Sequence, residues 1–277
     1  MFGDITRIGA NFHAMESLFN LKQVNGKIGQ VQTRLSTGKR INSAEDDTSG
    51  YALAQHLQSR TRGLSQALDN VATAKNVLNI VEGGYQAQMT ILQTLKEKAT
   101  QAADGALSSD QRTAINDQYD ALLNEIDDIS TTTKFNDHSL FGNTMVFQVG
   151  EESSDQFSVS FSSSTSAAIG EDNTNISTAA LSSAASASAA IDTLDTAIKT
   201  LAEAIQAVGD NQARLSSKEE NLSTAISNTE ASRSRIEDAD FAKEQMNMMK
   251  LQILQQTSVS ALTQANSAPQ VVLSLFR

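Results

Sequence analysis

Apolar residues recur at alternating steps of three and four near both ends of the chain, and hardly at all in its middle. Near the start, the row comprises Leu18, Leu21, Val24 or Asn25, Ile28, Val31 or Gln32, and Leu35. Near the end, it comprises Ile191, Leu194, Ile198, Leu201, Ile205 and Val208. This heptad spacing places one narrow apolar stripe along a helix, and such a stripe must be buried against other helices. The pattern predicts a chain folded back on itself, with its ends side by side and suited to lateral packing against copies of itself.

Breaks in these rows predict where the helices begin and end. We expect helices over about residues 14–35, 43–104, 189–235 and 238–275. A further helix is expected to open at Ser108, which has the capping-box spacing to Gln111. Its apolar row is expected to be Ile115, Tyr119, Leu122, Ile126 and Ile129. The pair Gly83-Gly84 inside the second helix predicts either a bend or a close helix contact.

Two short runs in the middle of the chain alternate apolar and polar residues. The apolar members are Met145, Phe147 and Val149 in the first run and Phe157, Val159 and Phe161 in the second. A polar stretch separates the runs, so a β-hairpin is the natural interpretation. Residues 162–188 carry little apolar content and are interpreted as a surface connection. The Ser- and Thr-rich residues 153–188 would be either O-glycosylated or an unmodified solvated loop.

Composition narrows the function classes. The chain has 277 residues, with 32 Asp and Glu against 21 Lys and Arg, and this acidic balance argues against nucleic acid as a partner. The absence of Trp and Cys and the small number of Tyr disfavour the large compact core of an enzyme and exclude disulfides. The first residues lack the pattern of a cleaved signal peptide. Residues 251–276 are uncharged, but their many amides are too costly in hydrocarbon, so we expect burial in a protein assembly and no membrane insertion.

No residue pattern predicts a catalytic, cofactor-binding or metal site. The histidines His13, His56 and His138 are scattered without metal-ligand spacing. The cluster 45–47 (Glu-Asp-Asp) could be a cation site, although a charge complement to a helix N-terminus is the preferred interpretation. Met246, Met248 and Met249 would form an adaptable binding surface or, preferably, core or interface packing.

Several segments resemble bacterial flagellins. They are residues 35–50 (LSTGKRINSAEDDTSG), 234–244 (SRIEDADFAKE), 124–136 (NEIDDISTTTKFN), and the ending formed by 264–266 and 273–277. The resemblance covers about residues 14–147 and 187–277, in the order found in the family, and on these motifs the chain is identified as a member of it.

The resemblance implies a mainly α fold. Paired N- and C-terminal segments would form a long antiparallel coiled-coil rod, with a small β-hairpin. The implied layout is an inner coiled-coil domain from 1–43 and 236–277, a rod domain from 44–140 and 189–235, and the hairpin with a short outer connection over 141–188. Family members usually insert large outer domains where this chain has about 25 polar residues, so it resembles a minimal flagellin.

The implied function is that of a structural subunit, with no enzymatic activity, that self-assembles into the extracellular filament of the bacterial flagellum for motility. The implied partners are further copies of the chain, the flagellar type III export apparatus, a C-terminal export chaperone, the filament cap and hook-associated proteins. A hook–filament junction protein is the alternative within the flagellum. A secreted adhesin or immune ligand that acts as a monomer is an alternative of another class.

The polymerisation stripe is expected along both terminal helices, where burial would be completed only when copies associate. Its residues are Leu18, Leu21, Ile28, Leu35, Leu251, Leu254, Leu262 and Leu273.

A second expected surface is a degenerate receptor-recognition patch. Flagellins of gut bacteria are recognised by a Toll-like receptor at a helix segment that resembles residues 92–101. In strongly recognised members, Arg stands in the place of Thr94, Leu in that of Lys98 and Glu in that of Gln118. The full patch here is Thr94, Lys96, Glu97, Lys98 and Gln118. Because these substitutions remove the expected contacts, the resemblance implies weak or no activation of the receptor, although plain solvated helix positions remain the alternative interpretation.

Overall fold

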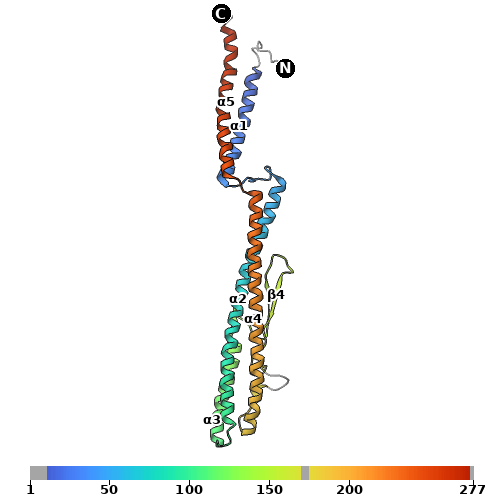
Figure 1. Ribbon diagram of the computed structural model, residues 1–277, viewed down its shortest axis with the longest axis vertical. Helices are drawn as coiled ribbons and strands as arrows, with labels where there is room; N and C mark the ends of the chain where they lie inside the picture. Colours follow the sequence, from blue (N-terminus) through green and yellow to red (C-terminus); the bar gives the residue numbers. More distant parts are fainter. Residues whose placement is uncertain (1–10, 170–174, 275–277) are drawn as a thin grey trace. The chain divides into compact units, whose positions relative to one another are not determined.

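The structure is a computed structural model that describes residues 11–169 and 175–274, with residues 178 and 268–274 described by their backbone alone. It divides into two compact units. Unit 1 contains the chain up to Thr61 and from Asn228 onward, and unit 2 contains Arg62–Ser227. Two long helices, α2 (Thr48–Ala102) and α4 (Ala184–Glu237), each contribute to both units (Figure 1). The prediction of a mainly α chain of long paired helices with a small β-hairpin is confirmed.

Within unit 2, α2 and α4 run antiparallel. Three pairs of partners show this, since the residue numbers rise on α2 as they fall on α4. Lys75 Nζ lies 2.8 Å from Glu219, Gln212 donates to Glu82 at 2.8 Å, and Lys96 pairs with Asp195. Such half-exposed ion pairs contribute about 0–1 kcal/mol each, so they set register more than stability.

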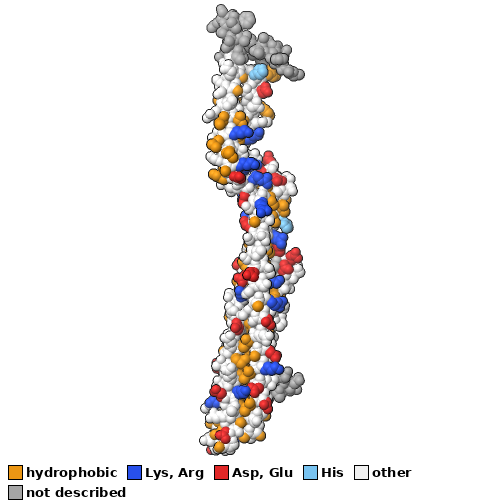
Figure 2. Space-filling model, viewed as in Figure 1, with side chains coloured by type: hydrophobic (Ala, Val, Ile, Leu, Met, Phe, Trp, Pro, Cys, Tyr) orange, Lys and Arg blue, Asp and Glu red, His pale blue; other side chains and the backbone are white. Residues whose placement is uncertain are grey.

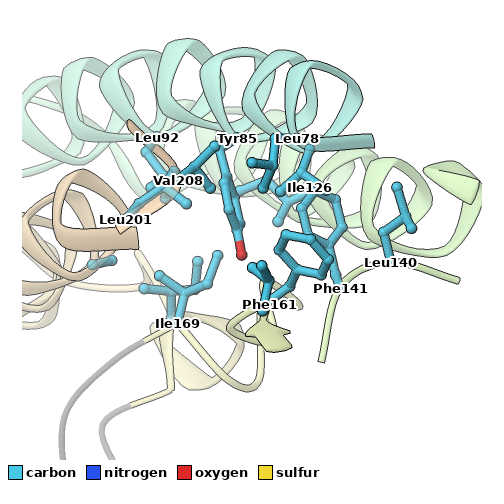
Figure 3. Close-up of a cluster of buried hydrophobic side chains, with 14 of the residues drawn as sticks. Leu78, Tyr85, Leu92, Ile126, Leu140, Phe141, Phe161, Ile169, Leu201 and Val208 are labelled. Carbon is cyan, nitrogen blue, oxygen red and sulfur yellow. The ribbon is translucent and has the colours of Figure 1, made fainter. Parts of the chain in front are cut away.

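The stability of unit 2 comes from a continuous apolar core along these helices. Tyr85 lies in the middle of the cluster, with Leu78, Leu92, Ile126 and Leu201 around it (Figure 3). Burial raises the pKa of Tyr85 to about 12, so its hydroxyl stays neutral and donates to the Ser162 carbonyl at 2.9 Å. The buried positions on α2 recur at three- and four-residue steps, as the heptad interpretation requires.

The third helix, α3 (Ser109–Thr132), begins as predicted. The Ser108 hydroxyl accepts from the Gln111 N–H at 3.3 Å, and the Gln111 side chain accepts from the Ser108 N–H at 3.0 Å. Its buried face differs in part from the expected row, because Leu123 and Ser130 are buried where Leu122 and Ile129 were expected. Leu122 packs only partly against the core.

Helix α2 passes through Gly83-Gly84 without interruption, so the alternative of a close contact is the correct one. A Cβ at Gly84 would lie 2.7 Å from Cζ of Phe141, whose ring centroid is 4.6 Å from that of Tyr85. Gly84 therefore lets the Phe141 ring lie directly against the helix backbone. Gly83 has no atom within 4 Å of its Cβ position and faces open space.

The predicted β-hairpin is confirmed. Strands β3 (Thr144–Gln148) and β4 (Gln156–Ser160) are antiparallel, with Phe147 opposite Phe157. The Arg214 guanidinium of α4 lies 4.7 Å from the centroid of the Phe157 ring. A second hairpin, β1 (Lys134–Phe135) with β2 (His138–Ser139), was not predicted because each strand has only two residues.

The expectation of a surface connection over residues 162–188 is wrong for its apolar members. Ile169, Ile176 and Leu181 are buried and belong to the core of unit 2. Ser166 fixes the segment by donating from its backbone N–H and its hydroxyl to the Asp127 carboxylate, at 2.6 and 2.7 Å. A 3-10 turn, η1 (Ile176–Thr178), follows, and α4 begins at Ala184 instead of residue 189.

The contact at Gly84 gives a matched pair of substitutions. Gly83→Ala should raise the free energy of unfolding by up to about 1 kcal/mol, because alanine is the better helix former and meets nothing. Gly84→Ala should lower it by about 1 kcal/mol, because overpacking against the buried Phe141 ring costs about 1–3 kcal/mol and outweighs the same helix gain. Urea unfolding of both variants measures the difference. Equal stabilisation by the two substitutions would contradict the close contact.

Candidate assembly surface

The two terminal helices of unit 1 form an antiparallel pair. Helix α1 (Phe12–Thr37) lies along α5 (Phe241–Ser274), far from it in sequence (Figure 1). Asn11 donates to the Ala265 carbonyl at 2.7 Å, and Gln255 donates to the Asn25 side chain at the same distance. Side-chain amides at these points fix one register, because a shifted pair would leave them without partners.

Apolar residues on the facing sides of α1 and α5 form the seam of this pair. The seam comprises Leu21, Val24, Ile28, Val31 and Leu35 of α1 and Met248, Leu251 and Leu262 of α5. Among its described side chains, only Val31 and Met248 are buried, and the others stay half-exposed. Two helices on their own cannot enclose a seam, so the pair is an incomplete core.

A tight joint connects the inner ends of the two helices. Gly38 ends α1 in the left-handed conformation, with φ of 72°, and its carbonyl accepts from the Ala239 N–H at 2.9 Å. Lys39 and Asp238 form an antiparallel bridge. The Glu237 carbonyl accepts from the Arg40 N–H at 2.6 Å. The segments 35–50 and 234–244, which carry the flagellin resemblance, are therefore in direct contact.

Glu237 is the electrostatic centre of the joint, with only 5% of its surface exposed. Its carboxylate lies 2.6 Å from Lys39 Nζ and 2.8 Å from an Arg233 nitrogen. Arg233 also bonds Glu230, and this bond lowers the pKa of Glu230 and raises that of Arg233. A buried carboxylate needs such paired cations, since removal of one partner leaves an uncompensated charge.

Helix α2 begins at Thr48, which corrects the expected start at Ser43. The Asp46 carboxylate accepts from the backbone N–H groups of Asn42 and Ser43, at 3.0 and 3.1 Å, and so holds a turn instead of a helix. Asp47 caps the helix by accepting from the Gly50 N–H at 2.9 Å. The cluster 45–47 thus serves the chain's own backbone, as the charge-complement interpretation proposed. The part of the chain that the structure describes has no group of three or more His, Cys, Asp or Glu placed to hold a metal ion.

The eight residues of the predicted polymerisation stripe occupy two different environments. Leu18 and Leu254 are exposed on the outside of the pair. The other described members lie half-buried in the seam; they are Leu21, Ile28, Leu35, Leu251 and Leu262. The side chain of Leu273 lies outside the described residues.

Larger apolar side chains, which the stripe did not include, face solvent on both helices (Figure 2). On α1 they are Phe12, Met15 and Phe19. On α5, Met246, Met249 and Ile253 are exposed and follow Ala242 at steps of four, three and four. This outer row (Ala242, Met246, Met249, Ile253) lies roughly half a turn around the helix from the seam. A second heptad row on α5 was the sequence signal for it.

The predicted receptor patch lies on α2 and α3. The Thr94 hydroxyl donates to the Thr90 carbonyl at 3.1 Å, and Lys96 is engaged with Asp195 of α4. Glu97 and Gln118 are exposed. Lys96, Glu97 and Asp195 line one shallow hollow of the surface, so part of the patch is already occupied by contacts within the chain.

None of the helices in the described part of the chain combines the length and apolar composition that a membrane crossing requires.

The turn before α2 predicts a dependence of stability on pH. The hydrogen bond from Gln30 and those from the two backbone N–H groups hold the pKa of Asp46 below its usual value of 3.8. A lowered pKa stabilises the fold above that usual value, and the contribution is lost as pH falls through the lowered pKa. Asp46→Asn should therefore lower the free energy of unfolding by about 1 kcal/mol at pH 7, and the deficit should shrink below about pH 3.8.

Urea unfolding at pH 7 and at pH 3 measures this dependence. Glu45→Gln, at the exposed neighbouring carboxylate, is the control and should change stability by less than about 0.5 kcal/mol. A deficit for Asp46→Asn that is the same at both pH values would count against the ionised carboxylate as the cause.

Comparisons with known proteins bear on these surfaces. The sequence models of the bacterial flagellin N-terminal and C-terminal helical regions match residues 8–145 and 191–276. The chain is 34% identical to a flagellin of Halalkalibacterium halodurans, over 98% of this chain and 99% of that one. It is 32% identical to flagellin FlaB1 of Treponema pallidum, with the same coverage. It is 33% identical to a flagellin of Bacillus subtilis, over 98% of this chain and 100% of that one.

A solved structure from Vibrio parahaemolyticus, assigned to the flagellar hook-associated proteins, also shares the fold. It superposes with a TM-score of 0.60 at 14% identity, over 70% of this chain and 100% of that one. Identity this low shows the fold alone, whereas the flagellin similarity runs through nearly the whole sequence, so the hook-junction alternative is not favoured. The chain belongs to the bacterial flagellins, whose members are the structural subunits of the flagellar filament.

Proposed function

We propose that the α1–α5 pair is the surface through which this flagellin subunit joins its neighbours in the filament. As a flagellin, the chain is a structural protein of the extracellular flagellar filament. The observation that supports the finer assignment is the exposure of large apolar side chains on both helices, around a seam that is itself only half-buried.

Energetics favour burial of this surface between copies. Complete burial of a Met, Leu, Ile or Phe side chain contributes about 1.5–3 kcal/mol. Six such residues stand exposed on the outer faces alone: Phe12, Met15, Phe19, Met246, Met249 and Ile253. Association has to overcome lost rotational and translational freedom, and several buried anchors of this kind are sufficient to do so. A second copy fits this surface better than a lipid bilayer, because amides are interspersed with the apolar residues.

The remaining partners are proposed on family grounds. An export chaperone that covers α5 before assembly would protect the same apolar faces from aggregation. The type III export apparatus, the filament cap and the hook-associated proteins would be met in turn as a subunit is exported and added. We also propose that the chain has no catalytic role, in keeping with a structural family.

Recognition by the Toll-like receptor is proposed to be weak. Support comes from Thr94, Lys98 and Gln118, which differ from the residues of strongly recognised members, and from the pairing of Lys96 with Asp195.

A charge in the outer row should block polymerisation. Ile253, which is 64% exposed, is expected to become buried on assembly, so Ile253→Glu should raise the critical concentration for filament formation at least about tenfold. The stability of the free subunit should change by less than about 0.5 kcal/mol, because the side chain is exposed there. Sedimentation of seeded filaments and circular dichroism of the free subunit measure the two quantities.

Gln252→Glu places the same charge on the adjacent exposed residue, outside the outer row. It should change the critical concentration much less than Ile253→Glu does. An unchanged critical concentration for Ile253→Glu would remove the outer row from the assembly surface.

The receptor proposal predicts a gain of signal. The triple substitution Thr94→Arg, Lys98→Leu and Gln118→Glu should raise the response in receptor reporter cells well above that of the unmodified chain. The Arg supplies a hydrogen-bond donor, the Leu an apolar contact and the Glu a negative charge. An unmodified chain that already matches an enteric flagellin in the same titration would refute weak recognition.

A further inference from the structure

We propose that Met246 and Met249 form an oxidation site, and that its oxidation state controls whether a free subunit can join the filament. The reagent class is a peroxide or another oxidant that transfers one oxygen atom. This inference rests on the proposed assembly surface.

Three methionines close together on α5 differ sharply in exposure. Met246 and Met249 are 60% and 50% exposed, whereas Met248 is only 7% exposed. The helical repeat explains the difference, because Met248 shares the seam side with Glu244 and Leu251, and its two neighbours point away from α1. The same short segment therefore offers two accessible thioethers and one protected thioether.

The chemistry at these residues needs no other protein group. A thioether sulfur attacks one oxygen of hydrogen peroxide, the O–O bond breaks, and an S–O bond forms. The sulfur loses two electrons to the peroxide, and the second oxygen leaves as water after taking up the proton. The product is methionine sulfoxide, which is polar and chiral and can be reduced by methionine sulfoxide reductases.

The position of the pair makes this change consequential. Met246 and Met249 share the outer row with Ala242 and Ile253, which offer no side-chain donor to a sulfoxide oxygen. Burial of an uncompensated polar group between subunits is unfavourable. The site is open in the free subunit and becomes closed on assembly, so oxidation excludes subunits before addition and leaves assembled ones protected.

The test exposes the full-length free subunit to hydrogen peroxide, removes the peroxide with catalase, and then measures sulfoxide at each methionine by peptide mass analysis. Sulfoxide should form at least about fivefold faster at Met246 and Met249 than at Met248. The critical concentration of the oxidised protein should rise at least about tenfold. Treatment with the two sulfoxide reductases should return it to the starting value.

Matched variants locate the effect. Met246→Leu combined with Met249→Leu keeps the apolar volume and should assemble normally after peroxide treatment. Met248→Leu and Met15→Leu keep the proposed site and should stay as sensitive as the unmodified chain; Met15 is the exposed methionine of α1. A double variant that loses assembly under peroxide as readily as the unmodified chain would overturn the proposal. So would an unmodified chain that assembles normally with both sulfoxides present.

The outcomes separate this proposal from the assembly surface itself. If Ile253→Glu blocks assembly but sulfoxide formation does not, the oxidation proposal fails and the surface stands. If Met246 and Met249 oxidise as fast in the filament as in the free subunit, the outer row is not buried by assembly, and both proposals fail.

Discussion

The structure of unit 1 depends on a geometric limit: one helix can cover only one side of another. Helix α5 has apolar side chains on two opposite sides, and α1 covers just the side that carries Met248 and Leu251. Even that seam stays half-exposed, because no third helix closes it. The subunit therefore holds an unfinished core along its terminal helices, and the self-association of flagellins is the arrangement that completes such a core.

Specificity in this pair comes from polar contacts more than from the apolar rows. A leucine row tolerates a shift of one heptad, but the Asn25–Gln255 pair and the Asn11–Ala265 bond do not. At the inner end, the joint adds a backbone bridge and the buried Glu237 with its two cations. The two sequence segments that most resemble flagellins meet here, because each supplies half of the hydrogen bonds that set how α1 and α5 leave the joint.

Much of this fold could be predicted from the sequence because its signals are local and periodic. The capping box at Ser108 and the alternation in β3 and β4 needed only near neighbours to be interpreted. The start of α2 was missed because Ser43 and Asp47 both have cap chemistry, and the hydrogen bonds of Asp46 to the turn decide between them. Ile169, Ile176 and Leu181 were missed because isolated apolar residues in a Ser-rich segment have no period. The outer row of α5 was missed because one good heptad row drew attention away from a second.

The antiparallel arrangement of α2 and α4 has a consequence for the order of folding. Asn25 and Gln255 are 230 positions apart, and closing so long a loop in an unstructured chain has an entropic cost that grows with its logarithm. Once α2 and α4 lie side by side, α1 and α5 extend from neighbouring helices, and the remaining loop is short. Nucleation should therefore begin among the local contacts of unit 2, with the terminal pair zipping up last and fraying first.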